Sequence, residues 1–301
     1  MRRPCPGAAR ATTGAGLRRP YRVSVVAPTL DSRRKFHWFL WACFTKQTWP
    51  DKELVVVETY ETEPSGFFLE KARRQANIVY VGLQHDFSIG LKRNIGLHLA
   101  SGEVVVNFDD DDLYAPNYIE SMLGHLEGQD AVALTLSTWY DFDKQQLKCG
   151  FVDPIALGTL DALEPSRGLA LRGQPCLAPE ERRPPPDAWD VLLGYGFSYV
   201  HLREPALARP YPDTSLGEDS AFAAGLQECL GPRGVRLLRD ELGLCLHVMH
   251  GGNTADSAVH RDADPEEVMG LAVWDLDFAL PLREAWQASF APSHVAGQFR
   301  H

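Results

Sequence analysis

The chain has 301 residues, of which 45% are hydrophobic, so it can hold one large domain or two small ones around a sizeable core. Its formal net charge of −10 disfavours a non-specific nucleic-acid-binding protein, which usually has a basic face. No apolar stretch is long enough to span a bilayer, so we expect a soluble protein. The six cysteines are scattered without zinc-ligand or C-x-x-C spacing, which suits reduced thiols in the cytoplasm.

The first twenty residues differ from the rest of the chain. They are rich in arginine, contain no acidic residue and lack the apolar core of a secretory signal. Such a segment could be an organelle transit peptide, which would imply import, or a disordered leader. The sequence leaves both interpretations open.

Apolar runs and helical periodicity alternate from Tyr21 to Trp139. Strands are expected at Tyr21–Ala27, Leu54–Val57, Ile78–Val81, Val104–Phe108 and Ala131–Trp139. Helices are expected from an N-cap at Ser32 through Phe44, and at Phe67–Ala76, Gly90–Ala100 and Pro116–Leu126. This alternation predicts an α/β, Rossmann-like domain over residues 21–260, with a mostly parallel central sheet and helices on both faces.

The second half of the chain is interrupted. Residues 160–188 are rich in Pro, Arg and Glu, which is typical of a surface loop or disordered insertion. Beyond it we expect a helix opened by Gly217 and running to Leu230, and strands at Val235–Leu238 and Leu242–Val248. Residues 261–301 form a C-terminal extension with an amphipathic helix predicted from Pro265 to about Phe278.

The strand predicted at Val104–Phe108 is followed directly by Asp109, Asp110, Asp111 and Asp112. Adjacent carboxylates repel one another, so clustering them destabilises the fold unless a cation neutralises them. The carboxyl end of a strand is where open α/β sheets bind ligands, and carboxylate oxygens suit Mg²⁺, Mn²⁺ or Ca²⁺. An EF-hand is excluded, because its alternating ligands, central Gly and closing Glu are absent. The alternative is a solvated acidic turn.

Two further groups of polar residues begin predicted helices. Lys92, Arg93 and Asn94 lie in a first turn, where the helix dipole favours an anion such as a diphosphate. Glu218 and Asp219 follow Gly217, and a carboxylate near a bound diphosphate could be a general base. Each group also has an ordinary explanation, a solvated basic face in the first case and acids that complement a helix dipole in the second.

Taken in order, these segments resemble the inverting family 2 glycosyltransferases of the GT-A fold. The resemblance spans about Tyr21 to Thr254. The motifs that carry it are Val26–Thr29, Leu54–Glu58, Gly90–Asn94 (G-x-x-R-N), Asn107–Pro116 (D-x-D-D), Gly217–Asp219 and His250–Thr254 (H-x-x-N-T). Single motifs are weakly specific, but six in the right order are strongly specific.

The resemblance implies transfer of a hexosyl or N-acetylhexosaminyl group from a nucleoside-diphosphate sugar, most often UDP-linked, to a hydroxyl of a glycan, lipid or protein acceptor. It implies Asp219, supported by Glu218, as the base that activates the acceptor hydroxyl. A Mn²⁺ or Mg²⁺ ion would be bound by Asp111 and Asp109, with His250. The residues implied in donor binding are Pro28, Thr29, Asp31, Glu58, Lys92, Arg93, Asn94, Asp109 and Asp110, with Glu58 at the base and Asp110 near the ribose.

Three other functions stay open from the sequence. A nucleotidyltransferase would normally have a Gly-rich loop after the first strand, where this chain has Pro28-Thr29-Leu30-Asp31-Ser32-Arg33. A non-catalytic carbohydrate-binding or scaffold protein could keep the fold. A plain metal-binding protein would not explain Gly217-Glu218-Asp219. Trp189 and Tyr195 could stack on an acceptor sugar, although aromatic residues at such spacing are more often in the core.

Overall fold

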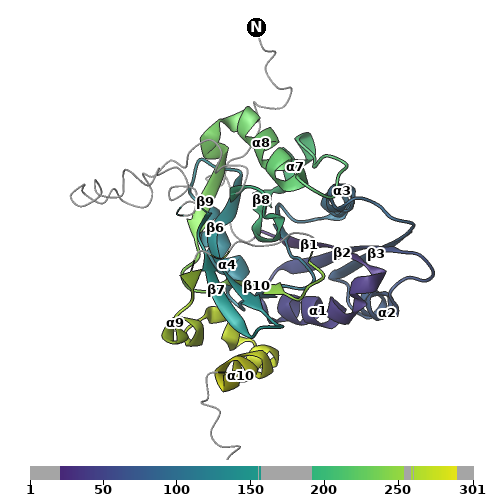
Figure 1. The fold of residues 1–301 in the computed structure, drawn as a ribbon. Helices are drawn as coiled ribbons and strands as arrows, with labels where there is room; N and C mark the ends of the chain where they lie inside the picture. The colour runs from purple at the N-terminus through teal and green to yellow at the C-terminus, as the bar shows by residue number, and fades with distance from the viewer. Residues whose placement is uncertain (1–20, 155, 157–191, 254–258, 260, 290–301) are drawn as a thin grey trace, which may run out of the picture.

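The computed structural model describes residues 21–154, 156, 192–253, 259 and 261–289 (Figure 1). The predicted leader, residues 1–20, and the predicted insertion, residues 160–188, lie outside the described residues, as does Trp189. Among the described helices, none has the length and apolar character needed to cross a bilayer.

Four parallel strands form the first half of a mixed sheet. They are β1 (Val23–Leu30), β2 (Lys52–Tyr60), β3 (Ile78–Gln84) and β4 (Val104–Asn107), in the order β3-β2-β1-β4. The runs of valine and leucine in β1, β2 and β4 are almost completely buried, which is expected of strands covered on both faces, whereas β3 is mostly half-buried. The register places Thr29 opposite Glu58, and Val26 opposite both Val55 and Asn107, so the carboxyl ends of these strands meet at one edge.

Helices cover both faces of these strands. Helices α1 (His37–Lys46) and α2 (Gly66–Arg74) lie on one face, and α3 (Ile89–Leu99) lies on the other (Figure 1). Ser65 and Ser88 cap α2 and α3 by accepting hydrogen bonds from Phe68 N and Leu91 N. The predicted cap at Ser32 is wrong, because residues Asp31–Phe36 form a 3₁₀ turn and α1 begins only at His37.

The second half of the sheet contains antiparallel strands. Strand β8 (Val200–Leu202) pairs antiparallel with β4 and with β6 (Ala133–Asp143), and β7 (Lys148–Val152) and β11 (Arg261–Asp262) extend that edge. Strands β9 (Val235–Arg239) and β10 (Cys245–Met249) pair parallel to β6, and β5 (Leu113–Tyr114) pairs antiparallel to β10. The β5–β10 pair brings the C-terminal part of the chain to the end of the acidic loop.

The described helices that pack on this half include α4 (Tyr118–Leu126), α7 (Arg203–Ala208) and α8 (Glu218–Leu230). Gly217 precedes α8 with a φ of 75°, a left-handed conformation that glycine adopts without strain. The start of α8 at Glu218 places both acids of the Gly-Glu-Asp segment in its first turn.

The single helix predicted from Pro265 to about Phe278 is wrong. Helix α9 (Pro265–Met269) ends at Gly270, short 3₁₀ turns follow at Ala272–Asp275 and Asp277–Ala279, and α10 spans Leu280–Ser289. The helix breaks because Ala272 N and Val273 N donate to the carbonyl oxygens of Leu242 and Gly243 instead of to the preceding turn. These tertiary hydrogen bonds hold Trp274 in the core, where it is 5% exposed.

Candidate active site

A cavity opens where the carboxyl ends of β1 and β4 meet the start of α8. Crevices at this position of an open α/β sheet are the usual ligand sites of such folds. The lining residues are Pro28, Thr29, Leu30, Arg33, Ile89, Lys92, Arg93, Asp109, Asp110, Asp111, Gly194, Tyr195, Gly196, Phe197, Ser215, Leu216, Gly217, Glu218, Asp219, His247 and Asn253. The cavity therefore collects the acidic loop, the basic pair of α3 and the acids of α8, which are far apart in the sequence.

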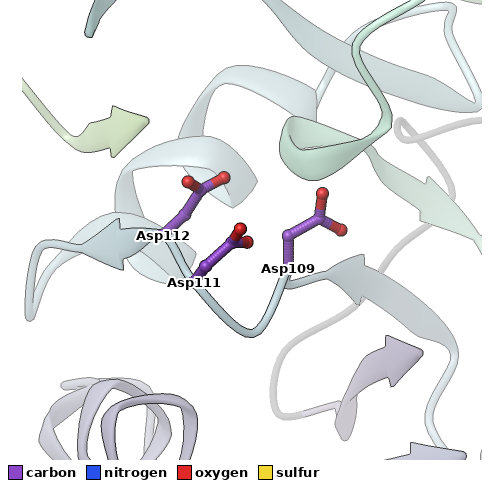
Figure 2. A group of neighbouring side chains, drawn as sticks. All are labelled: Asp109, Asp111 and Asp112. Atoms are coloured by element: carbon purple, nitrogen blue, oxygen red, sulfur yellow. The ribbon is translucent and has the colours of Figure 1, made fainter. Parts of the chain in front are cut away.

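The acidic loop Asp109–Asp112 joins β4 to β5. Figure 2 shows the carboxylates of Asp109, Asp111 and Asp112 on the same side of the loop, and one oxygen of each lies within 4.8 Å of the others. Tyr114 holds the loop in place. Its hydroxyl accepts a 2.9 Å hydrogen bond from Asp109 N, and its ring stacks on that of Phe108 with centroids 3.7 Å apart. Three convergent carboxylates suit a hard divalent cation.

Arg33 neutralises part of this loop. Its Nε and Nη2 atoms both lie 2.7 Å from Asp110 Oδ1, and Nη2 also contacts Asp111. Burial raises the pKa of Asp110 to about 7 even though Arg33 opposes this shift. Burial acts in the same direction on Asp111, but Arg33 and His250 outweigh it and lower the pKa of Asp111. The Arg33 guanidinium therefore neutralises part of the acidic loop, a role that the sequence analysis assigned to a metal ion.

His250 lies beside Asp111. Its Nε2 donates to Asp111 at 2.9 Å, its Nδ1 accepts from Gly252 N at 3.2 Å, and its ring packs on Phe36 at 4.7 Å. These partners place the imidazole proton on Nε2. His250 thus orients Asp111 here, and direct ligation of a metal through Nε2 requires the other tautomer.

Asp112 and His247 form a second acid–histidine pair. His247 Nδ1 and Val248 N donate to Asp112 Oδ1 at 2.9 and 3.0 Å, and the His247 ring stacks on Phe197. Burial alone would lower the pKa of His247, but the adjacent Asp112 raises it to about 10, so the pair's shared proton resides on the imidazole. The other oxygen of Asp112 is buried and has no hydrogen-bond partner among the described residues. An unpartnered buried carboxylate oxygen in a cluster of acids fits a bound cation.

Arg93 connects the acidic loop with α8. Its guanidinium is 3% exposed, contacts Asp219, and lies 3.0 Å from Glu218 and 3.5 Å from Asp109. Burial raises the pKa of Asp219 to about 8, and the neighbouring carboxylates of Glu218 and Asp109 add to this shift against the effect of Arg93. A carboxyl group that titrates near neutral pH inside a cavity is a candidate acid–base catalyst.

The backbone beside Asp219 leaves no room for a side chain. A Cβ atom added to Gly196 would overlap the Asp219 carboxylate. Gly196 is held in this position because its carbonyl oxygen accepts a 3.0 Å hydrogen bond from Asn107 Nδ2, at the end of β4. The sheet thus sets the distance between the Asp219 carboxylate and the wall of the cavity.

Several residues predicted to bind the donor do not face the cavity. Glu58 is completely buried and accepts hydrogen bonds from Arg34, Tyr80 and Ser65 N. Asp31 and Asn94 are also outside the lining. Asp31 accepts from Glu61 N, and the Asn94 amide is paired with the backbone of Tyr211.

The start of α3 also differs from the expected anion site. Lys92 reaches the cavity, but its buried ammonium donates to Thr29 O at 3.0 Å and Thr59 Oγ1 at 3.3 Å. The amides of Gly90 and Leu91 are already bonded to Thr214 O and Ser88 Oγ. The amides of Gly90 and Leu91 and the Lys92 ammonium are therefore already hydrogen-bonded within the protein. Arg93 is the cation of this segment that contacts the carboxylates of the cavity.

Sequence reasoning missed Arg33 and His37, assigned no role to His247, and noted Tyr195 only as an acceptor contact. Tyr195 lines the cavity and packs against Trp139 with ring centroids 4.4 Å apart. Arg33 and His37 lie in the segment after β1, where no motif marks them. Arg33 contacts Asp110, 77 residues away, and His37 contacts Thr29 and Ser65, 8 and 28 residues away, and none of these separations belongs to a recognised motif.

Residues 24–148 match the family model described as glycosyl transferase family 2. The match contains β1 to β6 and the whole acidic loop. It ends before α8, so the Gly217–Asp219 segment lies outside it.

A curated relative and two solved structures are similar to this chain. The glycosyltransferase GlyG of Streptococcus pneumoniae serotype 4 is 27% identical over 126 residues, which cover 40% of this chain and 40% of GlyG. The S. aureus TarS 1–349 structure has a TM-score of 0.51 at 16% identity, covering 75% of this chain and 60% of that one. Its complex with UDP-GlcNAc has a TM-score of 0.51 at 17% identity, covering 91% and 74%. The predicted GT-A fold is confirmed by this similarity, which at such identities shows the fold alone.

Proposed function

We propose that this protein is a metal-dependent, inverting glycosyltransferase that moves a hexosyl or N-acetylhexosaminyl group from a UDP-sugar to an acceptor hydroxyl. The observation that carries the proposal is that one cavity joins the acidic loop to Asp219, with Arg93 in contact with both Asp109 and Asp219. The family 2 match supports the reaction class, and the UDP-GlcNAc bound by TarS supports the donor class.

The donor set of the acidic loop suits Mn²⁺ or Mg²⁺, because it consists of convergent carboxylate oxygens. Asp109 and Asp111 would hold the ion, one carboxylate oxygen of Asp112 lies within 4.8 Å of theirs, and His250 beside Asp111 is the candidate nitrogen ligand. A divalent ion there would neutralise charge that develops on the departing diphosphate. Arg33 would have to leave Asp111 to make room.

Donor binding is proposed for the end of β1 and the acidic loop. Pro28 and Thr29 line the cavity next to Asp110, whose carboxylate would accept hydrogen bonds from the ribose hydroxyls. Arg93 is the residue of α3 placed to contact the diphosphate, because it already lies between acids on two sides of the cavity. Preorganised positive charge of this kind stabilises a leaving group as its negative charge develops.

Asp219 is proposed as the general base. Inversion at the anomeric carbon requires the acceptor oxygen to attack opposite the departing diphosphate, in a single displacement. As the new bond forms, Asp219 takes the hydroxyl proton, and the UDP oxygen leaves with the electron pair of the broken bond. Burial raises the pKa of Asp219, Glu218 adds to this shift and Arg93 opposes it, and together they set the pH at which the carboxyl group is ionised.

A panel of UDP-sugars tests this proposal. Release of UDP should require Mn²⁺, rise when an acceptor is supplied, and give a product whose anomeric configuration, read by NMR, is opposite to that of the donor. Release of pyrophosphate from a nucleoside triphosphate and a sugar phosphate would instead indicate a nucleotidyltransferase. Binding of UDP-sugars with no turnover for any acceptor class would indicate a non-catalytic binding protein.

A further inference from the structure

A chain of buried side-chain hydrogen bonds leads away from Asp110 into the protein. Thr29 Oγ1 lies 2.5 Å from Asp110 Oδ2 and 3.1 Å from His37 Nε2, and His37 Nδ1 lies 3.0 Å from Ser65 Oγ. Thr29, His37 and Ser65 are each no more than 2% exposed. The chain joins the end of β1, the first turn of α1 and the N-cap of α2.

The direction of every hydrogen bond follows once Asp110 is ionised. A carboxylate only accepts, so the Thr29 hydroxyl must donate to Asp110 and its oxygen must accept from His37 Nε2–H. The other imidazole nitrogen, Nδ1, then carries a lone pair and accepts from the Ser65 hydroxyl. Ser65 Oγ in turn accepts from Phe68 N at 3.4 Å. With this imidazole tautomer, every donor in the chain has an acceptor.

The His37 ring is buried within this series of hydrogen bonds. It packs on the Phe68 ring with centroids 4.9 Å apart, and it does not line the cavity. Burial lowers the pKa of His37 to about 4, so the imidazole is neutral at neutral pH. Its single N–H, on Nε2, donates to Thr29. His37 therefore acts on the cavity only through Thr29.

We propose that His37 is a positioning residue for donor binding. It fixes the Thr29 hydroxyl so that this group donates to Asp110 and holds the carboxylate in the orientation that receives the ribose. The inference rests on the proposed function, in which Asp110 contacts the nucleotide. Without His37, the Thr29 hydroxyl can rotate away, and Arg33 alone orients Asp110.

The central variant is His37→Phe, which keeps a flat ring against Phe68 and removes both hydrogen bonds. Loss of one buried, orienting hydrogen bond is worth about tenfold in affinity, so we expect UDP to bind about tenfold more weakly in the presence of Mn²⁺. In turnover, the KM for the donor should rise by a similar factor while kcat stays near that of the wild type. His37→Gln, whose amide can donate to Thr29, should recover most of the affinity.

A double-mutant cycle with Thr29→Val separates positioning from a general structural effect. If His37 acts through Thr29, then His37→Phe has no further effect on UDP affinity once Thr29 is Val. The measurements are isothermal titration with UDP and Mn²⁺ at pH 8, with thermal unfolding as the check on folding. Thr29→Val removes the hydroxyl that joins His37 to Asp110, so unchanged UDP affinity in this variant would overturn the proposal even where His37→Phe fails to fold.

The outcomes are distinct. Weaker UDP binding by His37→Phe, recovery by His37→Gln and non-additivity with Thr29→Val support the proposal. Wild-type affinity in His37→Phe, or losses that add in the double variant, would overturn it while leaving the proposed function intact. If the wild-type protein binds no nucleoside diphosphate, the proposed function fails, and the role of His37 fails with it.

Discussion

Arg93 donates to the Asp219 carboxylate although the two residues are 126 positions apart and lie near the starts of different helices, α3 and α8. The same guanidinium reaches Asp109 in the acidic loop. One buried cation therefore links the proposed base with the proposed metal site. This arrangement predicts that the two sites can be separated by mutation, because each acid contacts Arg93 from its own segment.

Asp219→Asn should abolish the base without disturbing donor binding. The amide oxygen can still accept from Arg93, so the fold and the affinity for UDP should change little. Since a positioned general base typically contributes about 10²–10⁴-fold, we expect transfer to fall by that factor. Initial rates of UDP release at saturating donor measure the loss, and titration with UDP is the control. Near-normal turnover in this variant would exclude Asp219 as the base.

The rate should increase with pH through the titration of Asp219. Its pKa is raised to about 8 by burial and by the nearby Glu218 and Asp109 carboxylates, so the active, ionised base forms only as pH rises. We expect log kcat/KM for the donor to rise about one unit per pH unit below that value and to level off above it.

Glu218→Gln provides the matched comparison for this profile. Removing a neighbouring negative charge lowers the pKa of Asp219, so the rising limb should move to lower pH. A profile that is flat in the wild type, or a limb that does not move in the variant, would contradict the assignment.

Asp111→Ala should abolish metal-dependent binding of UDP. The loop would lose one of its three convergent carboxylates, together with the partner that orients His250. Titration of UDP with and without Mn²⁺ measures the effect, and we expect the difference between the two conditions to vanish. Asp213→Ala is a suitable control, because this carboxylate accepts from Ser88 and does not line the cavity. A full metal effect in Asp111→Ala would exclude Asp111 as a ligand.

The sequence predicted the fold well because its strands are unambiguous. Val104–Val106, for example, is apolar and β-branched, and the structure buries it almost completely in β4. The position of Asp219 beside the acidic loop could be anticipated only from the order of the motifs. Neither propensity nor periodicity brings a residue of α8 to the end of β4.

The sequence could not predict which of the proposed ligand-binding side chains are already hydrogen-bonded to other parts of the protein. Glu58 lies near the carboxyl end of β2, but its carboxylate already accepts hydrogen bonds from Arg34 and Tyr80. Lys92 begins a helix as expected, but its ammonium bonds to Thr29 O and Thr59 instead of remaining free for an anion. Such contacts depend on tertiary geometry, which a local pattern does not contain.

Arg33→Leu should strengthen binding of Mn²⁺ in the absence of nucleotide. Arg33 pairs with Asp111, a proposed metal ligand, and with the neighbouring Asp110, so its removal frees Asp111 for the ion and leaves more negative charge beside it. We expect an increase of about tenfold, or ~1.4 kcal/mol. The matched control is Arg34→Leu, since Arg34 pairs with Glu58 and does not contact the acidic loop. Unchanged or weaker Mn²⁺ binding in Arg33→Leu, measured by isothermal titration, would show that the guanidinium does not compete.

Gly196→Ala should slow sugar transfer because the added methyl group displaces the Asp219 carboxylate. The added methyl group would overlap the Asp219 carboxylate, so the base must move, and a misplaced catalytic group can cost about 10²-fold in rate. Gly124→Ala is the control, because that glycine lies within α4 with no atom within 4 Å of an added Cβ, and the change should stabilise the helix by about 0.5–1 kcal/mol. Transfer rates and thermal unfolding of both variants give the comparison. If Gly196→Ala turns over like Gly124→Ala, the close approach of the Gly196 backbone does not set the position of the base.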